Sequence, residues 1–207
     1  MHVPDHFSVK NAAWAQEIMQ RHSFATLVSG HTTSLTASHL PLLWTNSEQG
    51  YGLIQGHMAR ANPQWQDFSE DSEVMAIFTG PDSYISPNWY VARPAVPTWN
   101  YTAVHAYGTP RVIDDQHAAR KLLRRMVAIF DSDPEQAWPN DQPQADLVDE
   151  MIPHIVAFEI SIVRLDAKAK LSQNRSAIDQ ASVISALQNS SQEGAQALAK
   201  YMRNSSS

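Results

Sequence analysis

Six stretches of the sequence have the composition of β-strands, and they constrain the fold more than any other feature. They are rich in aromatic and β-branched residues or alternate apolar with polar side chains, and they cover residues 24–29, 34–44, 51–58, 73–80, 98–113 and 154–168. Strands mostly follow strands, with only a few helices between them. This order predicts a mainly β protein with peripheral helices (α+β), built as an antiparallel barrel of about six strands rather than a doubly wound parallel sheet.

Prolines, glycines and the alternation of side chains predict where the strands end, bend and bury a face. Pro41 predicts that the far half of 34–44 is an edge or a bulge, because proline cannot donate to a sheet. Gly80 and Pro81 are expected to close the fourth strand, and Gly108 to Pro110 to kink the fifth. Two sets of residues are expected to share a face each: Leu35, Ala37 and His39 in one strand, and Val156, Phe158, Ile160 and Ile162 in another.

Helical spacing predicts helices over 11–22 and 115–130, and two short ones around 183–187 and 194–202. The helix over 115–130 has an apolar stripe of Ala118, Leu122, Met126 and Ile129, and a basic face of Arg120, Lys121, Arg124 and Arg125. A basic face of this kind is more often solvated than bound to DNA.

Composition narrows the classes of protein. The 207 residues, 43% of them hydrophobic, suffice for one domain with a real core. There is no cysteine, so disulfides and thiolate chemistry are excluded, and the net charge of −6 disfavours a large nucleic-acid footprint. No apolar run approaches the ~20 residues of a membrane span, and the first residues lack a signal-peptide layout. These features predict a soluble, cytoplasmic protein that does not bind membranes.

The sequence lacks the motifs of several common metal and active sites. The nine histidines include no His-x-His or His-Glu-x-x-His, so no metal is expected. The sequence also lacks Gly-x-Ser-x-Gly, a Walker loop and Gly-x-Gly-x-x-Gly, which leaves a hydrolase, kinase or Rossmann oxidoreductase unsupported.

The stretch LIQGHMARANPQW (53–65) starts as a strand and ends as the start of a helix. Asn62 is a good helix cap and Pro63 suits the first helical position. His57 and Arg60 lie just upstream, with small residues around the arginine. Helix N-termini and arginine forks both bind phosphate, so the corner is interpreted either as a phosphate site or as a solvated surface turn.

Two further stretches have the composition of a ligand site. VPTWNY (96–101) places an indole and an amide side by side, which suits a flat heteroaromatic ligand, although core packing of Trp99 explains it equally well. KAKLSQNRS (168–176) combines Lys170, Gln173 and Arg175 around one apolar anchor. It is interpreted either as a solvated connector or as a contact with an anionic ligand.

Taken in chain order, HLPLLW, GHMARANPQW, IFTGPDSYISPNWY, VPTWNY and KAKLSQNRS resemble the PaiB-type family of FMN-binding negative transcriptional regulators. PTWNY and KLSQNR are hallmark strings of that family and are present without substitution. The resemblance implies a split β-barrel related to pyridoxamine 5′-phosphate oxidase, with FMN at the interface of a homodimer. It also implies one domain over 1–207, ending in helices at about 177–203.

The resemblance implies where FMN would lie. His57 and Arg60 become the phosphate ligands, with backbone groups of the HMARAN corner close by, and the strand before it lies along the flavin ring. The expected FMN-binding residues are Ala37, Ser38, His39, Leu40, His57, Met58, Ala59, Arg60, Asn62, Trp99, Asn100, Lys170, Gln173 and Arg175. Trp99 and Asn100 are included for their chemistry alone, and catalytic residues are not assigned.

Three functions follow from this resemblance. The first is a regulator in which bound flavin alters an interaction with DNA or a regulatory protein. The second is a flavin-dependent oxidoreductase acting on a small molecule, with His39 and His105 as candidate acid–base groups. The third is a haem-binding split barrel, which no local motif favours.

Overall fold

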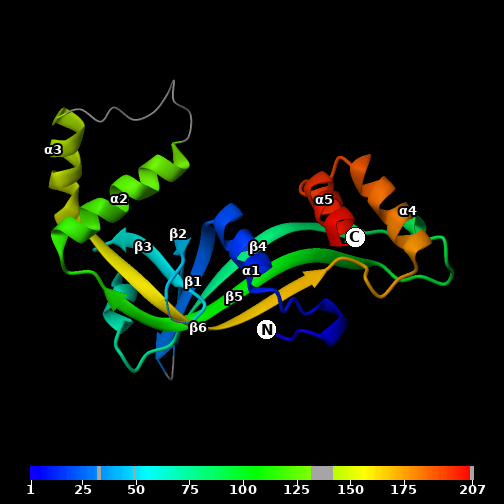
Figure 1. Cartoon of the computed structure of the whole chain (residues 1–207), viewed down its shortest axis with the longest axis horizontal. Helices are drawn as coiled ribbons and strands as arrows, with labels where there is room; N and C mark the ends of the chain where they lie inside the picture. The colour runs from blue at the N-terminus through cyan, green and yellow to red at the C-terminus, as the bar shows by residue number, and fades with distance from the viewer. Residues whose placement is uncertain (32–33, 49, 132–141, 206–207) are drawn as a thin grey trace. The chain divides into compact units, whose positions relative to one another are not determined.

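The structure is a computed structural model that describes residues 1–31, 34–48, 50–131 and 142–205. Its helices and strands follow one another along the chain as shown in Figure 1. In order they are η1 (Asp5–Phe7), α1 (Ala12–Arg21), β1 (Phe24–His31), β2 (Ser34–Thr45), β3 (Leu53–Ala59), η2 (Pro63–Asp67), β4 (Val74–Ile85), η3 (Pro87–Trp89), β5 (Thr98–Val112), α2 (Gln116–Phe130), α3 (Gln142–Met151), η4 (Ile152–His154), β6 (Ile155–Lys170), α4 (Ala177–Gln188) and α5 (Ala195–Ser205).

The six strands form a closed barrel in the order β1-β2-β3-β6-β5-β4. β1 pairs antiparallel with β2 and β4, and β3 pairs antiparallel with β2 and β6. Closing the sheet removes most of the exposed edges that an open sheet of this length would leave, although β2 stays unpaired along part of its length. The mainly β barrel with peripheral helices that the sequence predicts is therefore confirmed.

The chain divides into two compact units. The first unit comprises Met1–His22, Phe78–His105 and Asp166–Ser207, and the second comprises Ser23–Ile77 and Ala106–Leu165. β4, β5 and β6 each contribute residues to both units.

In the second unit, β6 alternates as predicted. Val156, Phe158, Ile160 and Ile162 are all at most 3% exposed, and Phe68 meets the ring of Phe158 edge-on at 5.4 Å. Ala157, on the other face, is buried beneath α2 with Leu122 and Met126. Burying each large apolar side chain contributes roughly 1.5–3 kcal/mol to stability.

The apolar stripe of α2 differs from the predicted one. Ala119, Leu122 and Met126 are buried, whereas Ile129 is 47% exposed and Ala118 is only half-buried. The stripe is shorter because the helix packs on the sheet through its first three turns only. α3, which the sequence did not predict, follows it in the same unit.

Pro41 marks a change of strand partner within β2. Residues up to Pro41 pair with β1, and Leu42 to Thr45 pair with β3. Among the described residues, the far half pairs only with β3, which agrees with the predicted edge, although the side chain of Leu42 is fully buried. The near half, Ser34–Leu40, pairs only with β1, so it has a second open edge that was not predicted.

The sequence predicts that the fourth strand ends at Gly80 and Pro81, but β4 continues to Ile85. A Cβ on Gly80 would lie 2.1 Å from Oγ1 of Thr102 on β5. The glycine therefore permits close packing of two strands and does not form a turn. β5 runs through Gly108 and Pro110 as one strand, Thr98–Val112, which confirms the strand predicted over 98–113.

In the first unit, α4 and α5 lie side by side (Figure 1). Their apolar faces pack with Ile85, Tyr90 and Leu171 into one buried cluster. α4 begins at Ala177, where Ser176 accepts from Asp179 N, and so is longer than the predicted 183–187. Among the described residues, no helix has both the length and the apolar composition needed to cross a membrane.

Asp179 fixes the loop that precedes β5. Its carboxylate accepts hydrogen bonds from the backbone N–H groups of Val91 at 2.8 Å and Ala92 at 3.0 Å, and it is 2% exposed. The bond from Ala92, with a further one from Val91, lowers the pKa of Asp179 although burial opposes the shift. The carboxylate therefore stabilises the fold above its unfolded-state pKa, and this contribution is lost as the pH falls through the lower folded-state value.

Asp179→Asn keeps the acceptor and removes the charge. We expect the variant to be less stable than the wild type at pH 7, with the difference shrinking below about pH 4, where the unfolded carboxyl protonates. Urea unfolding at pH 7 and pH 3 measures the difference, with the exposed Asp71→Asn as the matched control. A difference that stays constant between these pH values would contradict the assignment.

Candidate functional site

Hydrogen bonds donated by backbone N–H groups fix the corner between β3 and η2. Arg60 N donates to His154 O at 2.8 Å, and Asn62 Oδ1 accepts from Gln64 N at 3.0 Å. Pro63 stands at the first helical position. The cap predicted from Asn62 and Pro63 is therefore confirmed, and the corner is a fixed turn.

This corner contacts the near half of β2. Asn62 Nδ2 donates to Ser38 Oγ at 2.8 Å, and Gln64 Nε2 donates to the carbonyls of Leu27 at 3.0 Å and Thr36 at 3.2 Å. Two of the predicted groups, 37–40 and 57–62, are thus brought together in the second unit. Gln64 is 1% exposed and was missed from the sequence, because its partners are 28 and 37 residues away in the chain.

Arg60 already uses part of its guanidinium. Nε donates to Pro153 O and Nη2 to Ile155 O, both at 2.8 Å, and the group lies 5.8 Å from the centre of the Trp65 ring. The side chain therefore ties the start of β6 to the corner. Nη1 makes no hydrogen bond to the described residues, so one donor group is left for an anion, rather than the two-pronged contact that an unengaged fork offers.

His57 contributes a neutral ring. Burial lowers its pKa, so the imidazole is uncharged at pH 7 and provides a hydrogen bond rather than a charge. Its Nδ1 and the Oε1 of Gln64 are both buried without a hydrogen-bond partner among the described residues. Buried polar atoms without a partner are rare and costly, and they indicate that a ligand or water meets them.

The remaining predicted residues of this group differ in exposure. Ala37 and His39 are exposed and Ser38 and Leu40 are half-buried, as the predicted alternation requires. His39 Nδ1 lies 3.0 Å from Thr26 Oγ1. Met58 is 2% exposed and offers a ligand only its backbone, whereas Ala59 is exposed at the end of β3.

The other predicted residues lie in the first unit. Trp99 is 53% exposed and meets Tyr84 edge-on at 6.3 Å. Asn100, its neighbour, is buried and donates from Nδ2 to Ser172 Oγ at 2.8 Å, while its Oδ1 is buried with no partner among the described residues. The indole is thus available for stacking, and the amide joins β5 to the turn after β6.

That turn is held by Gln173. Its Oε1 accepts from Leu171 N at 2.7 Å and its Nε2 donates to Ala169 O at 2.5 Å, around Ser172 with a φ of 64°. Lys170 donates to Thr98 Oγ1, and burial lowers its pKa. Arg175 stacks over Tyr90 at 4.6 Å. The segment is therefore a packed turn rather than a solvated connector.

Comparison with known proteins identifies the family of this chain. Residues 1–164 match the family model described as "Putative FMN-binding domain". The chain belongs to this family. It is also 36% identical over 202 residues to the protease synthase and sporulation protein PAI 2 of Bacillus subtilis (strain 168), covering 98% of this chain and 96% of that protein. The PaiB-type resemblance is confirmed, and FMN is the cofactor of the family.

Solved structures share the fold at low sequence identity. The FAD and haem binding protein of Mycobacterium smegmatis superposes with a TM-score of 0.63 at 14% identity, covering 84% of this chain and 78% of that one. The flavocytochrome Anf3 of Azotobacter vinelandii has a TM-score of 0.58 at 16% identity, covering 81% and 72%. These likenesses establish the split-barrel fold alone.

Proposed function

We propose that this protein is a PaiB-type regulator that works as a homodimer and holds FMN where the β3–η2 corner meets the open edge of β2. The hydrogen bond from Asn62 to Ser38 carries the proposal, because it joins the two segments expected to contact the cofactor. In this proposal residues 1–207 act as one FMN-binding domain.

The residues of the corner suit FMN in their chemistry. Nη1 of Arg60 and the ring of His57 would contact the phosphate, and Oε1 of Gln64 would accept from a ribityl hydroxyl. The phosphate and the ribityl hydroxyl would be the missing hydrogen-bond partners of His57 Nδ1 and Gln64 Oε1, which are both buried without one. Bound FMN supplies electron transfer at its ring, and Ala37 to Leu40 would lie along that ring. Trp99, Asn100, Lys170, Gln173 and Arg175 are proposed as further flavin contacts.

Exposed apolar residues support the dimer. Phe24 is 71% exposed and Leu35 is 80% exposed, and both lie on the paired strands β1 and β2. Open strand edges that carry apolar side chains are prone to pairing with another chain. A second copy of the protein, with FMN between the copies, would cover this edge.

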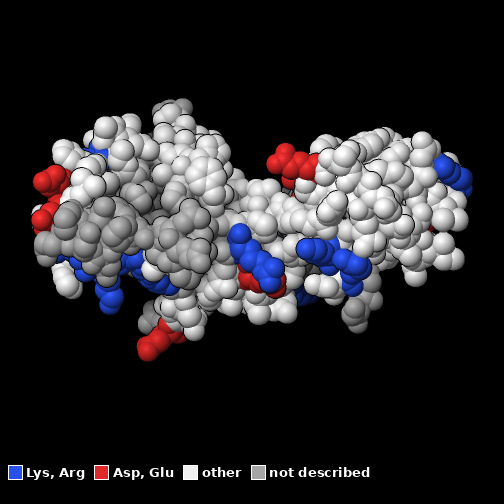
Figure 2. All heavy atoms as spheres, turned by 90° about the horizontal axis from the view of Figure 1, so that it is seen from above, with Lys and Arg blue, Asp and Glu red and all other residues white. Residues whose placement is uncertain are grey.

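The charge distribution favours a protein partner over direct DNA contact. The net charge is −6, and on the face seen in Figure 2 lysine and arginine side chains form small separate groups. On α2, Arg120 contacts Asp149 and Arg125 contacts Gln55. A continuous basic surface is what DNA binding requires, so we propose that the flavin changes a contact with a regulatory protein. The lack of cysteine suits a cytoplasmic location.

Purification tests the proposal directly. We expect a yellow dimer that releases about one FMN per chain on denaturation, checked by absorbance, mass spectrometry and light scattering. We also expect no steady-state oxidation of NADH or NADPH in air. Sustained turnover would make the protein an oxidoreductase, a red-brown haem spectrum would make it a haem protein, and salt-sensitive retention of promoter DNA would replace the protein partner with DNA.

A further inference from the structure

Two lysines at the end of β6 lie on the same face of the strand in the first unit. Ala169 and Leu171, on the other face, belong to the buried cluster formed with α4 and α5, and side chains alternate between the two faces of a strand. Lys168 and Lys170 therefore point away from that cluster. The N-terminal segment runs beside this part of β6, where Ser8 forms a bridge with Lys168 (Figure 1), and Lys168 is only 9% exposed.

The buried ammonium group of Lys168 has no carboxylate partner. It donates to the backbone carbonyl of His2 at 3.1 Å and lies 5.2 Å from the centre of the Tyr101 ring, and neither contact supplies a full negative charge. Neither Lys168 nor Lys170 forms an ion pair with a described residue. Buried charges in proteins are normally paired, so this ammonium indicates that a negatively charged or electron-rich ligand meets it.

Lys170 adds a second positive charge to this face. Its ammonium donates to Thr98 Oγ1 on β5. Burial lowers the pKa of Lys170, and the charge of Lys168 adds to this shift, although Tyr101 opposes it. The two ammonium groups therefore destabilise each other, and a ligand with electron-rich oxygens would relieve their repulsion.

Aromatic side chains lie on the neighbouring strand. Trp99 and Tyr101 are two residues apart on β5 and share one of its faces, opposite the buried Asn100. β5 is the neighbour of β6 in the barrel, so an aromatic face lies next to the cationic one. This combination suits a flat ligand that carries oxygens at its edge.

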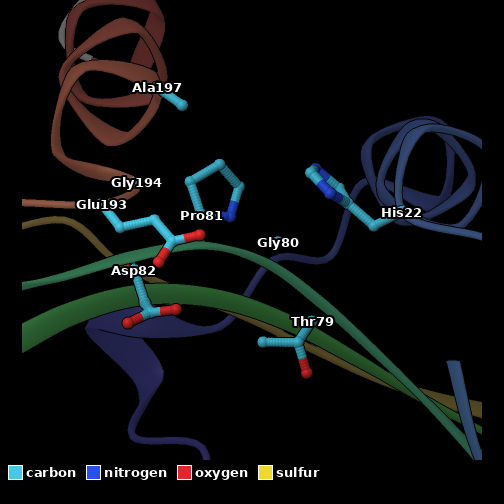
Figure 3. A pocket seen from close by; sticks show the side chains of 8 residues that line it. All are labelled: His22, Thr79, Gly80, Pro81, Asp82, Glu193, Gly194 and Ala197. Atoms are coloured by element: carbon cyan, nitrogen blue, oxygen red, sulfur yellow. The ribbon is translucent and has the colours of Figure 1, made fainter. Parts of the chain in front are cut away.

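A pocket in the same unit does not offer a site for such a ligand. Figure 3 shows the carboxylates of Asp82 and Glu193 beside a space of about 320 Å³, across from the imidazole of His22. No lysine or arginine is among the described residues that line it. Its carboxylates would repel electron-rich oxygens, whereas the two lysines of β6 attract them.

We propose that Lys168 and Tyr101 bind the flavin ring, with the ammonium of Lys168 at the edge that carries the two carbonyl oxygens. Neither is among the residues that the sequence predicts to bind FMN, whereas Lys170 and Trp99 are. The inference rests on the proposed function, because it takes FMN as the ligand. It assigns the ring to this group of residues and leaves the phosphate with the β3–η2 corner.

Riboflavin, which has the ring of FMN without its phosphate, tests this assignment. In full-length protein freed of flavin, Lys168→Met should weaken FMN and riboflavin alike, each about 10-fold or more, because a charged donor to the ring is lost. Asn62→Asp, beside the proposed phosphate, should weaken FMN alone. Lys121→Met, at an exposed position of α2, is the matched control and should leave both affinities unchanged. Titration followed by flavin fluorescence measures each affinity.

Unfolding of the flavin-free protein distinguishes a binding role of Lys168 from a structural one. Methionine keeps the apolar stem and removes an ammonium that has no counter-charge. The carbonyl of His2, an exposed residue, can bond to water instead. We therefore expect the urea midpoint of Lys168→Met to be no lower than that of the wild type.

Three results would overturn the inference. A loss of affinity confined to FMN would place Lys168 at the phosphate. Unchanged affinities for both flavins, with a lower urea midpoint, would make Lys168 a structural residue and leave the FMN proposal intact. Wild-type protein that binds neither flavin would refute the proposed function itself, and this inference with it.

Discussion

Replacing Gly108 with alanine should lower the free energy of unfolding by about 3 kcal/mol or more, because the new methyl group has no space. A Cβ at this position would lie 2.2 Å from Ser161 O and 2.9 Å from Ser161 C. These are backbone atoms of β6, and they cannot move without disturbing the barrel. Urea unfolding that follows tryptophan fluorescence measures the loss through the midpoint at a constant m-value.

Gly56 provides the matched control for this change. It is also buried in a barrel strand, but a Cβ there would meet Leu42 Cδ2 at 2.6 Å and Phe158 Cζ at 3.2 Å. The nearer atom is the end of a flexible side chain, so Gly56→Ala should cost less than about 1.5 kcal/mol. Similar losses for the two variants would show that strand spacing at Gly108 is not the constraint.

Asn62→Asp should weaken FMN binding about 100-fold. Aspartate caps a helix as well as asparagine, so η2 should keep its bond from Gln64 N. The bond that Asn62 Nδ2 donates to Ser38 Oγ can be replaced by one that the serine hydroxyl donates to the new carboxylate. The added negative charge would face the phosphate proposed to lie beside Arg60 and His57. Two like charges a few ångströms apart near a protein surface repel each other by about 3 kcal/mol. A loss of this size corresponds to the expected decrease of about 100-fold in FMN affinity. Titration of apoprotein with FMN, followed by flavin fluorescence, measures the affinity.

Asn11→Asp is the control for that experiment. Asn11 caps α1 by accepting from Ala13 N at 2.9 Å, so the same substitution is made at a second cap that carries no proposed ligand contact. Its FMN affinity should stay within about twofold of the wild type, given the screening of surface charges by salt. Equal affinity of Asn62→Asp and wild type would place the phosphate elsewhere.

Local patterns in the sequence determined much of the fold and the family. Alternation predicted the buried face of β6, and Asn62 with Pro63 predicted the start of η2, because each depends on residues close together in the chain. The strings around PTWNY and KLSQNR indicated the family and its cofactor. Side-chain period and cap chemistry do not require knowledge of distant partners.

Tertiary structure alone decided the partners of the polar residues. Arg60 was predicted as a phosphate fork, yet its Nε and Nη2 donate to carbonyls 93 and 95 residues away. The role of Gln64 and the change of strand partner at Pro41 were likewise not predicted. Each depends on which strands and turns meet across the barrel, and contacts between residues far apart in the sequence leave no periodic signal in a single chain.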